Sequence, residues 1–168
     1  VLMTGGSVNN NTANRSGGIC LQNGADFSYS NGYVNGNSAT GNNGGGIDIF
    51  HDNSVLILNK VRVKGNSAIQ RGGGMYIQTA GSTATLTNCL ISGNVVGTTG
   101  TWEEGAGIRN YGTLNVYNST FAGNHTTGKG GGLCNSGTAT IKNSIFWGNT
   151  TGNTTPQIYN SGTITVSY

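Results

Sequence analysis

The side chains best suited to chemistry in this 168-residue chain are five carboxylates and two histidines. The carboxylates are Asp26, Asp48, Asp52, Glu103 and Glu104. Asp48, His51 and Asp52 lie close together in the sequence, and Lys60 or Arg62 follows on the next segment. Paired carboxylates, or a basic residue beside bound calcium, would support cleavage of polysaccharides. The alternation of the chain does not place these groups on one strand face, so we expect a solvated turn. We predict no catalytic residue, no metal site, no cofactor and no enzymatic activity.

The composition excludes several classes of protein. Glycine contributes 31 residues, proline one, and charged residues only 8% of the chain. A coiled coil contains many more charged and helix-forming residues, and a disordered chain usually has more charge and proline. No run of 18 apolar residues occurs, so we predict no membrane insertion by this segment. The net charge of +3 comes from scattered basic residues, which predicts no nucleic-acid partner.

A repeat of 25–30 residues dominates the sequence. An asparagine, usually preceded by glycine, marks each copy, and the residues three, eight and ten positions before it are apolar. The six asparagines are Asn11, Asn37, Asn66, Asn94, Asn124 and Asn149. The apolar pair at positions eight and ten has the two-residue period of a half-buried strand. A glycine-rich step such as Gly45-Gly46-Ile47 follows the asparagine in five copies.

This spacing predicts a fold. Each copy is expected to form two short strands joined by a corner, and a third strand at the glycine step. Asparagine dominates the corner and tolerates the left-handed backbone that a sharp corner needs, and we expect the glycines to supply positive φ at the other bend. We therefore predict an all-β, right-handed parallel β-helix of about six coils, which forms one domain over residues 1–168.

The recurrent asparagines predict an internal amide ladder. Neighbouring coils lie about 4.8 Å apart, so the amide of one asparagine reaches the next. An inward asparagine without a partner would cost about 1–3 kcal/mol. We therefore assign a structural role to the column from Asn11 to Asn149.

The three cysteines do not predict a disulfide framework. Cys20 and Cys134 occupy the same column, but four coils apart. Four strand spacings amount to about 19 Å, whereas a disulfide requires Cα atoms within about 7 Å. Cys89 replaces serine in an inward column, which predicts a small buried side chain.

Two segments resemble a known family of repeat proteins. Phe121-Ala122-Gly123-Asn124 and Phe146-Trp147-Gly148-Asn149 fit the Phe-x-x-Asn motif of the polymorphic outer-membrane proteins, and Gly17-Gly18-Ile19 is similar to their Gly-Gly-x-Ile motif. The wider class of bacterial surface β-helix proteins has similar coils. The resemblance implies a secreted or cell-surface protein, often an adhesive one, with a surface glycan or a host protein as partner.

The two ends of the chain predict self-assembly. Ile164-Thr165-Val166 falls in the same columns as Val1-Leu2-Met3, after what the spacing indicates is a whole number of turns, and we expect both ends to be uncapped. An uncapped end is an unpaired strand edge, and head-to-tail contacts generate open filaments. We therefore expect a structural, extracellular or cell-surface subunit of a head-to-tail homopolymer. Its expected interface residues are Val1, Leu2, Met3, Ile164, Thr165, Val166 and Tyr168.

Three other functions stay open at this point. The chain is alternatively a piece of an adhesin that binds a host or matrix ligand, a carbohydrate-active enzyme, or an ice-binding protein. The ice-binding alternative rests on Thr-x-Thr pairs at the same position of the repeat, such as Thr83-Ala84-Thr85 and Thr138-Ala139-Thr140. Stacked coils would align these threonines in ranks on an outer face. Threonine is also a good strand former, which accounts for the same pattern without any ligand.

One loop is longer than its counterparts. The step from Asn94 to Ile108 is 14 residues, against 8 to 10 in the other copies, and it contains Trp102, Glu103 and Glu104. Insertions on repeat scaffolds often hold a binding function. We expect these three residues to make a lateral contact with a neighbouring rod or to bind a ligand such as a sugar.

Overall fold

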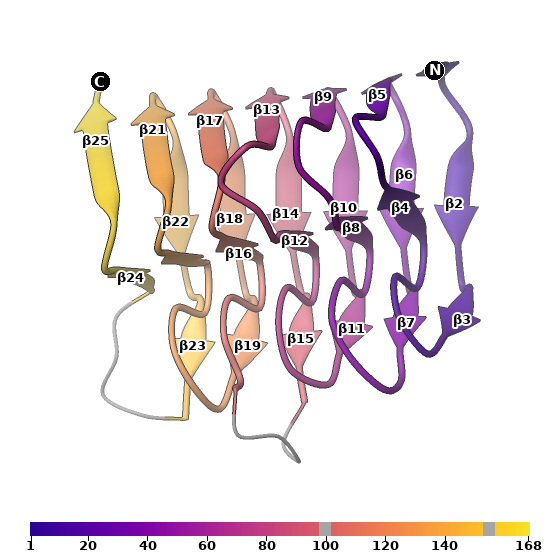
Figure 1. Ribbon diagram of the computed structural model, residues 1–168. Coiled ribbons are helices and arrows are strands. Elements are labelled where there is room, and N and C mark those ends of the chain that lie inside the picture. The colour runs from indigo at the N-terminus through magenta and orange to yellow at the C-terminus, as the bar shows by residue number, and fades with distance from the viewer. Residues whose placement is uncertain (98–101, 153–156) are drawn as a thin grey trace.

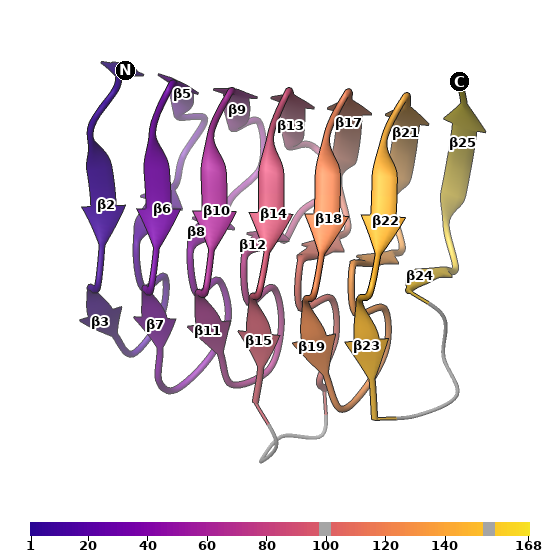
Figure 2. The same cartoon turned by 180° about the vertical axis from the view of Figure 1, so that it is seen from behind.

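The chain folds into a right-handed parallel β-solenoid. The computed structural model describes residues 1–97, 102–152 and 157–168. Within them the chain forms 25 strands and no helix, and so none long and apolar enough to cross a membrane. Figures 1 and 2 show the strands side by side along one axis, with the chain winding around that axis from the N-terminal to the C-terminal end. The predicted all-β fold of about six coils is confirmed.

The strands form four parallel sheets, which we name A to D. Sheet A contains β1 (Leu2–Thr4), β5 (Asp26–Ser30), β9 (Val55–Asn59), β13 (Thr83–Thr87), β17 (Thr113–Tyr117), β21 (Thr138–Lys142) and β25 (Thr163–Ser167). Sheet B contains β2 (Ser7–Asn9), β6 (Tyr33–Asn35), β10 (Arg62–Lys64), β14 (Leu90–Ser92), β18 (Thr120–Ala122) and β22 (Ile145–Trp147). Sheet C contains β3 (Thr12–Ala13), β7 (Ser38–Ala39), β11 (Ser67–Ala68), β15 (Val95–Val96), β19 (His125–Thr126) and β23 (Thr150–Thr151). Sheet D contains β4 (Ile19–Leu21), β8 (Ile47–Ile49), β12 (Met75–Ile77), β16 (Ile108–Asn110), β20 (Leu133–Asn135) and β24 (Ile158–Asn160).

Each complete coil contains four strands, one more than the sequence pattern predicts. The additional strand belongs to sheet C and directly follows the ladder asparagine, as β7 follows Asn37. Strands of this sheet are two residues long, so each has a single inward residue, such as Ala39 or Val96. Two residues are too few to display the alternation by which a strand is recognised.

The core consists of columns of apolar residues, one from each coil. In sheet B, Val34, Val63, Ile91, Phe121 and Phe146 lie in register. The first four are fully buried, and the rings of Phe121 and Phe146 stack with centroids 4.4 Å apart. Burial of each such side chain stabilises the fold by about 1.5–3 kcal/mol. Since a single coil exposes its own apolar face, the stacking of coils creates the core.

The two bends obey different constraints. The corner between sheets A and B has φ between 48° and 56° in five coils, at Asn31, Lys60, Asn88, Asn118 and Asn143. At the other bend the expectation is wrong in detail, because Gly44 has positive φ and the Gly45-Gly46 pair does not. A Cβ atom at Gly45 would lie 2.3 Å from the carbonyl oxygen of Ser67. This glycine is therefore required by the close approach of the next coil.

The outermost strands of sheet A share one register. Met3 of β1 pairs with Tyr29, and this column continues through every coil to Val166 of β25. Among the described strands, β1 and β25 each pair on one side only. Sheet A has seven strands and the other sheets have six. β1 and β25 therefore lie at the same phase six coils apart, as the sequence predicts, and the described strands form six coils plus one further strand of sheet A.

Candidate functional site

The asparagine ladder runs through the solenoid as the sequence predicts. The Nδ2 group of each ladder asparagine donates to the Oδ1 atom of the next, at 2.7–3.0 Å. The same Oδ1 atom accepts the backbone N–H of the preceding ladder residue. From Asn37 onward, Nδ2 also donates to a backbone carbonyl of the coil before, as Asn94 does to Val63. From Asn37 onward the side-chain amide of every ladder asparagine therefore makes hydrogen bonds through both its oxygen and its nitrogen.

Gln157 closes this ladder near β24. Its Oε1 atom accepts hydrogen bonds from the backbone N–H and the Nδ2 group of Asn149, at 3.2 and 3.0 Å. These are the two donors that a further ladder asparagine would satisfy. The other copies have glycine at the position of Gln157, so the repeat itself gives no sign of this role.

A second, shorter ladder escapes the sequence analysis. Asn110, Asn135 and Asn160 lie in register at the ends of β16, β20 and β24. The Nδ2 group of each of the first two donates to the Oδ1 atom of the next at 2.7 Å. In the earlier coils this column contains Leu21, Ile49 and Ile77. The sequence signal for this second ladder was a motif in the last three copies of the repeat. In it, the apolar residue that ends the step after the ladder asparagine is followed by any residue and then by asparagine.

The residues predicted as a subunit interface lie on the outer strands of sheet A. The exposed ones are Val1, Leu2, Thr165, Val166 and Tyr168, and the half-buried ones are Met3 and Ile164. If β1 of a second copy paired directly with β25, sheets B, C and D would each lack one strand at the junction between the two copies. If those sheets were stacked continuously, β1 and β25 would occupy the same place. A continuous join therefore requires β25 of one copy to replace β1 of the next.

The long insertion is divided between the surface and the interior. Residues 98–101 of it lie outside the described residues. Trp102 is 56% exposed, and the guanidinium carbon of Arg71 lies 5.2 Å from its ring centroid. Glu104 accepts a hydrogen bond from Arg109 at 2.9 Å and lies 3.4 Å from Nε of Arg71 in the preceding coil, and Glu103 accepts a hydrogen bond from a threonine hydroxyl of the following coil at 2.6 Å. The two acids therefore tie the insertion to neighbouring coils, while Trp102 faces solvent.

The outer side of sheet D is a buried polar column. Its members, in register, are Cys20, Asp48, Tyr76, Arg109, Cys134 and Tyr159. Asp48, Tyr76, Arg109 and Cys134 are at most 3% exposed. Side chains from the adjacent loops cover this column. Arg15 donates a hydrogen bond to Asp48, and Glu104 accepts one from Arg109.

The expectation of a solvated turn at Asp48 is wrong. The Oδ2 atom of Asp48 accepts hydrogen bonds from Nε of Arg15 at 3.0 Å and from the hydroxyl of Ser16 at 2.8 Å. Its Oδ1 atom is buried without a hydrogen-bond partner among the described residues. Burial raises the pKa of the Asp48 carboxyl, against the opposing effect of Ser16 and Arg15. Within the described residues, no three His, Cys, Asp or Glu side chains gather as a metal site requires.

The cysteines are free thiols, as expected. Cys89 and Cys134 are buried, and Cys20 is exposed. Burial raises the pKa of the Cys89 thiol, and it raises the pKa of Cys134 to about 11. A thiol in this state is a poor nucleophile, so both buried cysteines serve packing.

Threonines form two partial ranks on the outer side of sheet A. The first rank contains Thr83, Thr113, Thr138 and Thr163, and the second contains Thr85, Thr140 and Thr165 with Asn115 between them. In β9 the two positions are occupied by Val55 and Ile57. The ranks therefore cover four coils, and one of them is interrupted.

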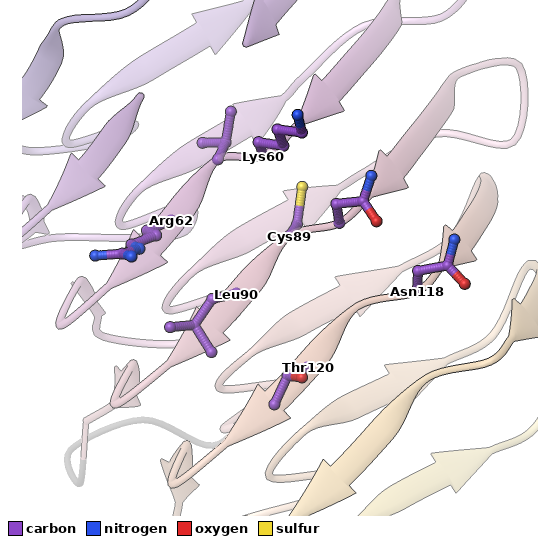
Figure 3. A pocket seen from close by; sticks show the side chains of 8 residues that line it. Lys60, Arg62, Cys89, Leu90, Asn118 and Thr120 are labelled. Atoms are coloured by element: carbon purple, nitrogen blue, oxygen red, sulfur yellow. The ribbon is translucent and has the colours of Figure 1, made fainter. Parts of the chain in front are cut away.

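A hollow of about 460 Å³ lies at the corner between sheets A and B. Its lining residues are Lys60, Val61, Arg62, Asn88, Cys89, Leu90, Asn118 and Thr120. Figure 3 shows Lys60 and Asn118 at the corner, and Arg62, Leu90 and Thr120 on three adjoining strands. These last three share one outward column, in which the side chains become shorter from Arg62 to Thr120. The volume falls within the range of ligand pockets.

Three cations lie along one coil beside this hollow. Lys60 is the corner residue, and Arg62 and Lys64 point outward from β10. All three are exposed, and none forms an ion pair within the described part of the chain. Along the sequence the basic residues are scattered, which predicts no cationic site. The missed signal was the alternation Arg62-x-Lys64 directly after the corner residue Lys60, because alternate residues of a strand share a face.

The same side of the solenoid also presents apolar residues. Inward Val34, Val63, Ile91 and Phe121 alternate with two outward columns, which we call the sheet-B outer face. It contains Tyr33, Asn35, Arg62, Lys64, Leu90, Ser92, Thr120, Ala122, Ile145 and Trp147. Trp147 is 73% exposed and Ile145 60%. Lys64 and Trp147 share a column and lie three strands apart, about 14 Å at the usual spacing.

No family model, no curated protein and no solved structure matches this chain. The functional argument therefore rests on the geometry of the sheets and their outer faces.

Proposed function

We propose that this chain is a structural β-solenoid, located outside the cell or on its surface, that adheres to a ligand through the sheet-B outer face. The observation that carries the proposal is that one outer face presents exposed Trp147 and Ile145 on β22 and the exposed cations Arg62 and Lys64 on β10, three strands away. The resemblance to bacterial surface repeat proteins supports the location.

The packing of the solenoid favours this face over the interior. The ladder asparagines from Asn37 onward bond to one another, and the buried ions of sheet D are paired with side chains of the covering loops, as Arg109 is with Glu104, so neither group is exposed to a ligand. In contrast, Trp147 and Ile145 gain from burial by a partner, since contiguous exposed apolar surface marks interaction sites. A rigid stack of parallel strands also fixes these side chains before binding, which lowers the entropy lost on association.

A retention assay tests the proposal. The immobilised chain is challenged with neutral polysaccharides, acidic polysaccharides and matrix proteins, and the bound fraction is measured. We expect at least one polymer to be retained, and Trp147→Ser and Ile145→Ser each to reduce retention at least fivefold. Ile57→Ser is the matched control, because Ile57 is a 45% exposed isoleucine on the outer side of sheet A. Retention of no polymer, or an equal loss in Ile57→Ser, would overturn the proposal.

Self-assembly is a second candidate, favoured by the common register of β1 and β25. In this arrangement β25 of one copy replaces β1 of the next, so that Val166 packs on Tyr29 in the place of Met3. The join is a strand addition, in which main-chain hydrogen bonds supply affinity.

Two substitutions with opposite effects test self-assembly. Met3→Asp weakens the packing of β1 on its own chain, so β25 of another copy can replace it more easily and rod formation should increase. Val166→Asp weakens the packing of β25 on the next copy and should abolish rod formation. Electron microscopy of the full chain at high concentration should show rods with an axial repeat of about 29 Å, six strand spacings. Single particles in all three proteins, or the same change in both variants, would exclude this candidate.

A further inference from the structure

We infer that the ligand of the sheet-B outer face is a polysaccharide that carries carboxylate groups, bound along the solenoid axis with its carboxylates at Lys60, Arg62 and Lys64. This inference rests on the proposed function, and it adds the chemical class of the ligand and its orientation.

The first argument is charge. Lys60, Arg62 and Lys64 place three positive charges on one coil, and they form no ion pair within the described residues. Arg62 and Lys64 are successive outward residues of β10, about 6.6 Å apart, and Lys60 lies at the corner that precedes this strand. Their outward neighbours in the adjoining coils, Asn35 and Ser92 among them, are uncharged. An anion at this row therefore meets no competing carboxylate on the neighbouring strands.

The second argument is the geometry of the arginine. Its guanidinium carbon lies 5.5 Å from the ring centroid of Tyr33, which holds the planar group against the face. A planar guanidinium binds a carboxylate through two parallel hydrogen bonds. The adjoining hollow of about 460 Å³ provides room beside Arg62 for the ring that bears the carboxylate.

The third argument is the chemistry of the rest of the surface. Asn88, Asn118 and Thr120 line the hollow with amides and a hydroxyl, which are donors and acceptors for sugar hydroxyls. Trp147 presents an exposed ring about 14 Å from Lys64 along the axis. A sugar ring can stack on this indole while a later residue of the same polymer reaches the cations.

Two other polymers fit the face less well. An extended peptide binds a sheet through a free strand edge, but the backbone of β10 is paired on both sides, with β6 and β14. A nucleic acid binds tightly when many phosphates are neutralised, whereas this face offers two cations, with Lys60 at the adjoining corner as a third. A carboxylated polysaccharide has a lower charge density and many hydroxyls, which matches the surface better.

Titration calorimetry with alginate as the probe tests the inference. The double variant R62Q/K64Q should lose at least tenfold in affinity. The control K129Q/K142Q removes the same charge from two exposed lysines off the face, and it should lose less than twofold. The wild-type affinity should fall between about 50 mM and about 200 mM salt, and this fall should be smaller in R62Q/K64Q. Dextran, a neutral polymer, should bind at least tenfold more weakly than alginate.

The outcomes separate the inference from the proposed function. Equal losses in the two double variants, no alginate binding by the wild type, or tighter binding of single-stranded DNA than of alginate would overturn the inference. Retention of a different polymer that still depends on Trp147 would leave the proposed adhesion intact and refute only the ligand class. Dextran sulfate is the last arm, since equal affinity for sulfate and carboxylate polymers would refute the assignment to carboxylate.

Discussion

The Oδ1 atom of Asn94 accepts two hydrogen bonds from Asn66, one from the backbone N–H at 2.9 Å and one from Nδ2 at 3.0 Å. Each ladder oxygen from Asn37 to Asn149 thus accepts both a main-chain and a side-chain donor of its neighbour. This double contact fixes the spacing of adjacent coils at the bend after sheet B, where the strands of sheet C are only two residues long.

Asn94→Ala should be among the most destabilising substitutions in the chain. It leaves the two donors of Asn66 without their acceptor, and it removes one donor each from the carbonyl oxygen of Val63 and the Oδ1 atom of Asn124. Since one unsatisfied buried group costs about 1–3 kcal/mol, we expect a loss of about 3 kcal/mol or more in unfolding free energy, measured by urea denaturation. Asn115→Ala, on the outer side of sheet A, should change it by about 0.5 kcal/mol or less. Similar losses in the two variants would refute the ladder's role.

Gly45→Ala should disrupt the stacking of coils. The added Cβ would lie 2.3 Å from the carbonyl oxygen of Ser67 and 2.4 Å from that of Gly73, and both are backbone atoms of the next coil. Overpacking typically costs about 1–3 kcal/mol, and we expect the upper end of this range because backbone must move. Gly65→Asn is the control, since Gly65 has open space around it and a φ of 63° that asparagine tolerates. Thermal unfolding should rank Gly45→Ala far below Gly65→Asn, and the reverse order would contradict the close-approach argument.

Asp48 should make the chain less stable as the pH rises. The pKa of Asp48 is raised in the folded protein above the value of 3.8 for a free carboxyl, so the folded state holds this proton more tightly. Its stabilising contribution is therefore fully present below about pH 4 and is lost as the pH rises through the raised pKa. Asp48→Asn lacks this titration. The stability of Asp48→Asn relative to the wild type should increase from acidic to neutral pH, measured by urea denaturation at each pH. A pH-independent difference would show that Asp48 does not titrate differently on folding.

The sequence predicts the repetitive parts of the fold and misses its singular ones. Residues equivalent to Asn37 and Val63 recur at fixed positions of the repeat in every coil, so the columns that they form and their inward direction follow from the spacing alone. Gln157 and Asp48 each occur once, and their partners are side chains from other coils, which periodicity does not reveal. The three cations Lys60, Arg62 and Lys64 fall between these cases. Their spacing is visible in the sequence, but the register of sheet B is needed to show that no acidic side chain of the described residues lies beside them.

Glu104 should hold the insertion and two arginines in place. Its carboxylate bonds to Nε of Arg109 at 2.9 Å and lies 3.4 Å from Nε of Arg71, and the side chain of Arg109 is 4% exposed. Removing one partner of a buried pair leaves an uncompensated charge, which costs about 3–5 kcal/mol. We expect Glu104→Ala to approach this loss in urea denaturation and Glu104→Gln to lose less, because the amide oxygen still accepts a hydrogen bond. Lys142→Ala, at an exposed site, should have little effect. Alginate affinity should be unchanged in Glu104→Gln, since Glu104 lies on a loop beside sheet D and not on the sheet-B outer face; a large loss of affinity would place the ligand on the wrong side of the solenoid.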